Sequence, residues 1–146
     1  MSSVRGRVTA VLAVAAAGAA GLAGCASPGG GAAKQVPPAR MVQTGKTRSV
    51  VLTPLGAKRI GIQTARSATK GRMVVVPFGA LLYEPDGRAA VYVQTAPLTY
   101  SRYFIAVSDI TAGQVFIRRG LTAGQPVVTV GAEELLGVQN GVGIET

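Results

Sequence analysis

The sequence predicts a mostly β fold: a small β-roll or barrel-like module with one or two short helices, preceded by a signal peptide and a disordered tether. Short apolar or alternating segments are separated by turn signals about every eight to twelve residues, which is typical of all-β modules. Only two short segments, 54–60 and 132–136, favour helices. The sequence shows no repeat with the period of roughly 20–50 residues that solenoids and propellers have.

The first 25 residues have the features of an exported lipoprotein. Two arginines precede an apolar run at 8–22, which is typical of a signal peptide. At fifteen residues this run is shorter than the roughly 20 residues that a membrane-spanning helix needs. Three residues of lipobox type stand directly before the only cysteine, Cys25: Leu22, Ala23 and Gly24. We therefore expect residues 1–24 to be a lipoprotein signal peptide and Cys25 to be lipidated. The alternative is an ordinary secretory signal with a chance cysteine.

The remaining residues divide into a tether and one domain. Residues 25–47 are rich in small residues and poor in large apolar ones, so we expect a lipid-anchored flexible tether. Residues 48–146 are expected to fold as a β-rich domain. A chain of about 100 residues buries only roughly 60–65% of its unfolded surface, and a single cysteine allows no disulfide within the chain. We therefore hypothesise that a partner surface contributes to its stability.

A short helix follows the first predicted strand, Ser49–Leu52. Thr53 and Pro54 form a favoured helix start, because threonine caps the first amides and proline suits the first helical position. Gly61 limits this helix to about two turns. Three residues are expected to supply its buried face: Leu55, Ile60 and Ile62.

The next segments indicate a buried strand and then a hairpin. Met73–Val76 is a continuous apolar run, as in a strand that is buried on both faces. Pro77 cannot donate to a sheet, so this strand ends there or reaches an edge. Glu84–Gly87 has proline second and glycine fourth, the composition of a type I turn. In the strand after it, alternate residues are expected on opposite faces: Val91 and Val93 on one, Tyr92 and Gln94 on the other.

Three further strands complete the prediction. Residues 99–110 alternate as one strand, with Tyr103, Ile105 and Val107 on the same face. The turn at 111–114 leads into a strand from Val115, and residues 121–126 lead into another from Val127. The expected core includes five apolar residues of this last region: Leu121, Val127, Val128, Val130 and Leu135.

Basic residues are concentrated in one part of the chain. Between Lys34 and Arg72 there are nine basic residues and no acidic one. A pI of about 10.7 is typical of nucleic-acid-binding proteins, but the export signal and the few aromatic residues argue against such a partner. We expect no nucleic acid. Beside a lipid anchor, each base near an anionic membrane is worth about 1 kcal/mol. A solvated charged face is the alternative.

The residue types of most active sites are missing. The chain has no histidine, and its cysteine is assigned to the anchor. These absences remove the usual general base, a Cys–His pair and any zinc site not made of carboxylates. Glu133 and Glu134 are adjacent, and neighbouring helical residues point about 100° apart, so we expect them to stabilise a helix N-terminus. We predict no catalytic residue, no metal, no cofactor and no enzyme activity.

Gly120 and Gly124 have the spacing of a glycine loop without its chemistry. A phosphate loop requires G-x-x-x-x-G-K-[ST], and a dinucleotide-binding turn requires G-x-G-x-x-G between a strand and a helix. The segment Gly120-Leu-Thr-Ala-Gly124 contains no lysine and precedes a predicted strand. We therefore interpret these glycines as positions of backbone reversal.

Two segments resemble the periplasmic adaptor subunits, or membrane fusion proteins, of resistance-nodulation-division efflux pumps. Residues 50–65 are similar to the segment that opens many such adaptors, and residues 74–135 look like their C-terminal segment. The matching features occur in the family's order: Val76-Pro77, Ala80-Leu81, Asp86-Gly87, Val91-Tyr92-Val93, Gly120-Leu121, Ala123-Gly124, Val127-Val128, Gly131-Ala132 and Glu134-Leu135. Many of these adaptors are lipoproteins. The resemblance implies structural roles for six residues: Pro77, Gly87, Gly120, Leu121, Gly124 and Gly131.

The resemblance covers about 100 residues and omits the distal part of an adaptor. A full adaptor continues through a lipoyl-like domain into a long helical hairpin and then returns. Here only seven residues separate Ala65 from Met73, and no coiled-coil heptads are visible. The resemblance therefore implies a shortened module of the membrane-proximal type, which would not bridge to an outer-membrane channel.

Two functional hypotheses follow. The first is an adaptor-like lipoprotein on the extracytoplasmic (periplasmic) face of the cell membrane. It contacts an inner-membrane efflux transporter and contributes to transmembrane transport, and a homo-oligomer is left open. The second is a free-standing envelope lipoprotein that binds a cell-wall polymer or anionic lipid through the basic stretch from Lys34 to Arg72. A third reading, the unstable product of a truncated adaptor gene, predicts rapid loss of the protein in cells.

Overall fold

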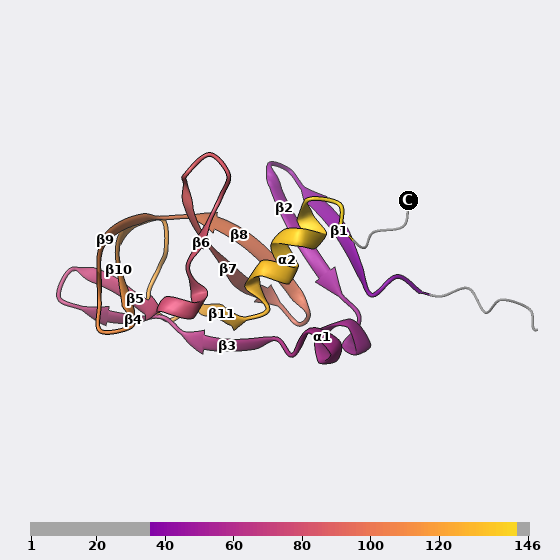
Figure 1. Ribbon diagram of the computed structural model, residues 1–146, viewed down its shortest axis with the longest axis horizontal. Coiled ribbons are helices and arrows are strands. Elements are labelled where there is room, and N and C mark those ends of the chain that lie inside the picture. Colours follow the sequence, from indigo (N-terminus) through magenta and orange to yellow (C-terminus); the bar gives the residue numbers. More distant parts are fainter. Residues whose placement is uncertain (1–35, 143–146) are drawn as a thin grey trace, which may run out of the picture. The chain divides into compact units, whose positions relative to one another are not determined.

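A computed structural model describes residues 36–142, which form two antiparallel sheets (Figure 1). Sheet A has seven strands in the order β1-β2-β8-β7-β11-β3, with β6 paired to β7. Sheet B has four strands in the order β4-β5-β10-β9. Two α-helices and one 3-10 helix complete this part of the chain. The predicted fold class, mostly β with two short helices, is confirmed.

The elements have the following bounds. Sheet A contains β1 Ala39–Thr44, β2 Thr47–Leu52, β3 Gln63–Arg66, β6 Leu82–Tyr83, β7 Ala89–Ala96, β8 Thr99–Phe104 and β11 Pro126–Val130. Sheet B contains β4 Ala68–Lys70, β5 Met73–Pro77, β9 Ala106–Thr111 and β10 Gln114–Arg119. The helices are α1 Pro54–Ile60, the 3-10 helix η1 Phe78–Ala80, and α2 Ala132–Gln139.

The prediction of a flexible tether over residues 25–47 was partly wrong, because strand β1 lies inside this range. It pairs with β2 through a tight turn at Gly45 and Lys46, with Thr44 opposite Thr47. Ala39 is only 3% exposed in the core beneath α2. The composition of residues 39–47 did not reveal this strand because its stability comes from pairing with β2 and from contact with α2. The folded part therefore begins before residue 48.

Helix α1 begins and ends where the sequence predicts. The Thr53 side chain accepts a hydrogen bond from the Gly56 amide at 3.0 Å, Pro54 opens the helix, and Gly61 closes it in the left-handed conformation. The expected buried face was partly wrong: Ile60 and Ile62 pack against the core, whereas Leu55 is 56% exposed.

The chain passes between the two sheets at points that the sequence did not reveal. The segment predicted as one alternating strand over 99–110 divides at Ile105, so that β8 belongs to sheet A and β9 to sheet B. The Ile105 amide donates to Ala89 O at 3.0 Å. At a second crossing, Ser67 donates its amide to Gln125 O at 2.9 Å and its hydroxyl to Thr122 O at 3.0 Å. These hydrogen bonds fix Ile105 against the start of β7 and Ser67 against the loop before β11.

Two apolar clusters form the core on either side of β7. The first lies beneath α2 and contains Tyr92 and Leu135, and the second lies between the sheets and contains Val91 and Val93. Alternate residues of β7 therefore point to opposite faces, as predicted, and both faces are buried. Of the expected core, three residues are fully buried, Leu121 is partly buried, and Val130 was predicted wrongly, since it is 43% exposed. The three are Val127, Val128 and Leu135.

The buried hydroxyl of Tyr92 is expected to make the fold less stable at alkaline pH. Tyr92 is 0% exposed and donates to Gln139 Oε1 at 2.5 Å. Burial raises the pKa of Tyr92 well above its usual range. The pKa of Tyr92 in the folded state exceeds its unfolded value of about 10. The contribution of the neutral hydroxyl to the stability of the fold is therefore complete below pH 10 and is lost as the pH rises above it.

We expect Tyr92→Phe to cost about 1 kcal/mol at pH 7, where it loses one hydrogen bond. The cost should shrink or reverse near pH 11, because the phenylalanine cannot ionise. Urea denaturation of both proteins at the two pH values measures this, with Tyr83→Phe, at a 58% exposed position, as the control. A cost that is independent of pH would contradict the assignment.

Candidate functional site

The predicted site residues do not converge on one site. The lipobox and Cys25 lie outside the described residues. Pro77 is the last residue of β5. Gly87 lies in the β6–β7 turn, Gly120 and Gly124 lie in the loop between β10 and β11, and Gly131 caps the start of α2; all four have positive φ angles. Leu121 packs partly buried against the second cluster. These residues therefore shape the backbone and do not line a shared cavity.

The loop from Gly120 to Gly124 uses its polar groups within the fold. The Gly124 amide donates to Ser67 O at 2.9 Å, and the Thr122 amide donates to the Gln125 side chain at 3.0 Å. A strand, β11, follows the loop. With these two amides bonded within the fold and a strand rather than a helix behind the loop, the segment lacks the features of a phosphate cradle. The positive φ angles of Gly120 (+102°) and Gly124 (+86°) support the interpretation as backbone reversal.

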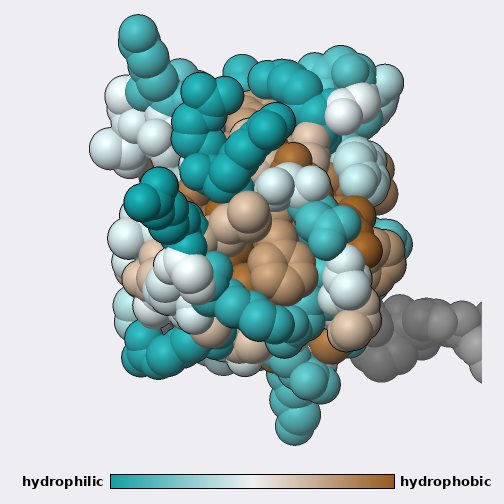
Figure 2. Space-filling model, turned by 90° about the vertical axis from the view of Figure 1, so that its left-hand side faces the viewer, coloured by the Kyte–Doolittle hydropathy of each residue, from teal (hydrophilic) through white to brown (hydrophobic). Residues whose placement is uncertain are grey.

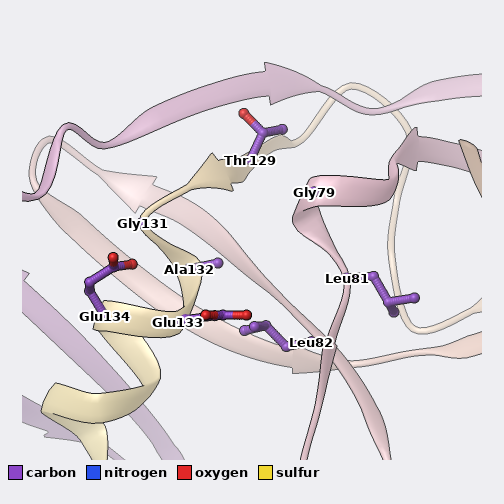
Figure 3. Close-up of a pocket in the computed structure, with 8 residues that line it drawn as sticks. All are labelled: Gly79, Leu81, Leu82, Thr129, Gly131, Ala132, Glu133 and Glu134. Atoms are coloured by element: carbon purple, nitrogen blue, oxygen red, sulfur yellow. The ribbon is translucent and has the colours of Figure 1, made fainter. Parts of the chain in front are cut away.

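A shallow groove of about 270 Å³ lies between η1 and the start of α2 (Figure 3). Glu133 and Glu134 stand in the first turn of α2, as predicted, and Figure 3 shows their side chains pointing apart. Both are exposed. Two divergent, solvated carboxylates cannot act jointly on one bond, and the groove offers them no partner for acid–base chemistry.

Two other carboxylates are committed to ion pairs. Asp86 lies 2.6 Å from Arg88, whose hydrogen bonds hold the pKa of Asp86 below its usual value. Glu84 lies 2.6 Å from Arg102. Over residues 36–142, no group of three or more potential ligands, His, Cys, Asp or Glu, is placed to hold a metal ion.

The exposed bases of the predicted basic stretch lie on different elements. Those that the structure describes are all exposed and are divided between β1, the β1–β2 turn, β2, α1, β3 and the β4–β5 hairpin. They are Arg40, Lys46, Arg48, Lys58, Arg59, Arg66, Lys70 and Arg72. The stretch is therefore continuous in sequence but not a single patch in space.

Sheet B presents an apolar outer face, the side opposite the second core cluster. Phe116 on β10 lies beside Val75 on β5 in the sheet register, and Lys70 on β4 lies beside Met73. The residues between them on these strands, such as Val76 and Val115, point into the core. We define the outer face of sheet B by Lys70, Met73, Val75, Asp109 and Phe116. Lys70 and Asp109 are exposed, Met73 and Phe116 are half-buried, and Val75 is buried beneath them at 6% exposure.

Charged side chains border this face. Lys70 Nζ lies 5.4 Å from the centre of the Phe116 ring, a cation–π distance. Arg118 and Arg119, at the end of β10, are exposed, and Asp109 is the acidic residue beside Phe116 in the register. Figure 2 views the end of the fold that carries sheet B, where apolar surface is surrounded by hydrophilic side chains. An apolar centre with a polar, solvent-accessible border is typical of a protein contact surface.

Sequence reasoning missed this face because both faces of β5 and β10 are apolar. The run Met73–Val76 was predicted as a strand buried on both faces, and Val75 and Val76 are indeed buried. Only the sheet order and register place Phe116, on the neighbouring β10, on the outer side.

Comparison with protein-family models gave no match, and comparison with curated proteins gave none either. Among residues 36–142, neither helix has the length and apolar character that crossing a membrane would require.

Proposed function

We propose that this protein is a lipid-anchored, adaptor-like module that contacts a membrane efflux transporter from the extracytoplasmic side and so contributes to transmembrane transport. The observation that carries the proposal is the outer face of sheet B, with Phe116 at its centre and Lys70 over the ring. The lipobox at Cys25 and the resemblance to efflux adaptors support the location and the type of partner. The proposal gives the protein no catalytic step.

The surface favours a partner of defined chemistry. Lys70, Arg118 and Arg119 are exposed around an apolar centre, with Asp109 on one side. An apolar projection bordered by carboxylates on the transporter would match both the centre and the border, and opposite charges would also speed the encounter. We therefore assign the contact to an acidic extracytoplasmic surface of the transporter.

The short connection between β3 and β5 supports contact with a transporter rather than bridging to an outer-membrane channel. Strand β3 ends at Arg66 and β5 begins at Met73, and the residues between them form only Ser67, the strand β4 and its turn. In the adaptors that the sequence resembles, the outgoing and returning chain at this point carries the distal domains. A three-residue strand and a turn offer no long arm, so the proposed action is local to the transporter.

A glutamate in place of Phe116 is expected to reduce copurification of the transporter from native membranes at least tenfold, because it puts a charge into the apolar centre and faces an acidic partner. Leu55→Glu is the matched control, since it adds the same charge at an exposed leucine on α1. Photo-crosslinkers at Arg118 and at Arg59 provide a second readout. Equal recovery with both variants, or crosslinks from Arg59 alone, would disprove the assigned face.

The second candidate function is binding of an anionic polymer or lipid by a free-standing envelope lipoprotein. The exposure of every described base between residues 40 and 72 favours it. The dispersion of these bases over several elements makes the whole stretch a poor single site, so any specific anion contact has to come from a local group of bases.

A further inference from the structure

We infer that the groove between the β1–β2 turn and the end of α2 is a binding site for a phosphate ester, of the kind carried by an anionic phospholipid headgroup. The groove has a volume of about 350 Å³. Three of its lining residues are cations, Lys46, Arg48 and Arg102, and the others include Phe104 and Gln139. This inference is independent of the transporter contact, which lies on sheet B.

The register of sheet A brings two of these cations together. Ser49 of β2 pairs with Ser101 of β8, and their hydroxyl oxygens lie 2.7 Å apart. Extending this register by one residue places Arg48 directly opposite Arg102. Like charges directly opposite each other in a sheet are destabilising. An anion between them would convert this repulsion into two charge-assisted hydrogen bonds.

The charges around the groove leave a positive surplus. Glu84 lies 2.6 Å from Nη1 of Arg102 and offsets that one cation. Within residues 36–142, Lys46 and Arg48 have no carboxylate within ion-pair distance. The end of α2, which reaches the groove through Gln139, contributes only about half a negative charge. A bound phosphate ester would balance this positive surplus.

Contacts with Glu84 and with the Phe104 ring hold Arg102 in place. Besides its ion pair with Glu84, its guanidinium lies 5.1 Å from the centre of the Phe104 ring, and Arg88 lies 3.9 Å from the same ring. A guanidinium that is already positioned loses little conformational freedom when it binds a phosphate, so less of the binding energy is spent on ordering it.

An adjoining groove favours a lipid headgroup over a free phosphate ester as the ligand. It has a volume of about 320 Å³, shares Arg48 and Gln139 with the basic groove, and is also lined by Met41 and Val42. A phosphate in the basic groove would thus have an apolar space beside it. Strand β1, which lines this second groove, is the first strand of residues 36–142 and follows the predicted lipid anchor in the sequence, and this favours a ligand at the membrane surface.

The test titrates the full chain, purified in a non-ionic detergent, with dihexanoylphosphatidylglycerol, dihexanoylphosphatidylcholine and glycerol 3-phosphate. We expect saturable binding of the phosphatidylglycerol, with amide chemical-shift changes centred on Thr47 and Phe104. Lys46→Gln combined with Arg48→Gln should weaken binding at least tenfold. Lys58→Gln combined with Arg59→Gln removes the same charge from α1 and should change it less than twofold.

The other ligands distinguish the source of the phosphate. Glycerol 3-phosphate that binds as tightly as the lipid would assign the groove to free phosphate esters, whereas weaker binding would assign it to the lipid headgroup; both support a phosphate site. If neither phosphatidylglycerol nor glycerol 3-phosphate binds saturably, the inference is overturned, as it would be by equal losses in the two double variants or by equal binding of the zwitterionic phosphatidylcholine. Thermal melts of the ligand-free variants confirm that each is folded.

Discussion

Replacing Gly120 by alanine is expected to destabilise the fold by about 3–4 kcal/mol, a large effect for the addition of one methyl group. A Cβ atom at this position would lie 2.2 Å from Phe104 O and 2.9 Å from Ile105 Cα, and both are backbone atoms. The φ angle of +102° adds strain for any residue with a side chain. Relief would require the loop after β10 to separate from the crossing between β8 and β9.

Gly124→Ala is the matched control in the same loop. Its φ angle is +86°, but an added Cβ would meet nothing within 4 Å. Only the conformational strain remains, so the expected cost is about 1–2 kcal/mol. Urea denaturation of both variants and the parent protein separates the cost of the close contact with Phe104 and Ile105 from the cost of the backbone conformation. Equal costs for the two glycines would show that the close approach to Phe104 is unimportant and that conformation alone explains both residues.

The helix α1 was predictable because its signals are local. Thr53, Pro54 and Gly61 act within a few residues of each other, and the structure uses each one as its chemistry suggests. The face that α1 buries was not predictable in the same way. Gly56, not Leu55, packs against the chain, and a Cβ on it would lie 2.3 Å from Pro38 O. That contact depends on residues just before β1, whose composition is typical of a flexible tether.

The errors in the strands have a similar cause. Tyr103, Ile105 and Val107 all contact the second cluster, so their alternation continues across Ile105 while the chain changes sheets there. In β11 the pairing with β3 shifts between Val128 and Val130, and this irregularity removes Val130 from the face that its alternation predicts. Both features are set by neighbouring strands rather than by the local pattern.

The candidate surfaces depend still more on tertiary pairing. The alternation of β10 does not say which of its sides faces the core; Phe116 lies half-buried on the outer face of sheet B because its neighbours Val115 and Ile117 belong to the second cluster. Arg48 and Arg102 are far apart in the chain, and only the pairing of β2 with β8 makes them neighbours. The lipid anchor is the reverse case, since the prediction at Cys25 rests on sequence alone and lies outside the described residues.

Leu135→Ala is expected to cost about 2–5 kcal/mol, because it opens a cavity in the cluster that joins α2 to sheet A. Leu135 is 0% exposed and packs with residues of β1, β2 and β7, among them Ala39, Val50 and Tyr92. A stability of roughly 5–15 kcal/mol is usual for a domain, so this loss would be a large part of the total.

Leu55→Ala makes the same chemical change on the other helix, where the leucine is 56% exposed. We expect a change within about 0.5 kcal/mol, since alanine is also a better helix former. Parallel urea titrations therefore test whether α2, rather than α1, closes the core of sheet A. A larger loss from Leu55→Ala than from Leu135→Ala would mean that the buried face expected from sequence is correct and that α2 contributes little to the core.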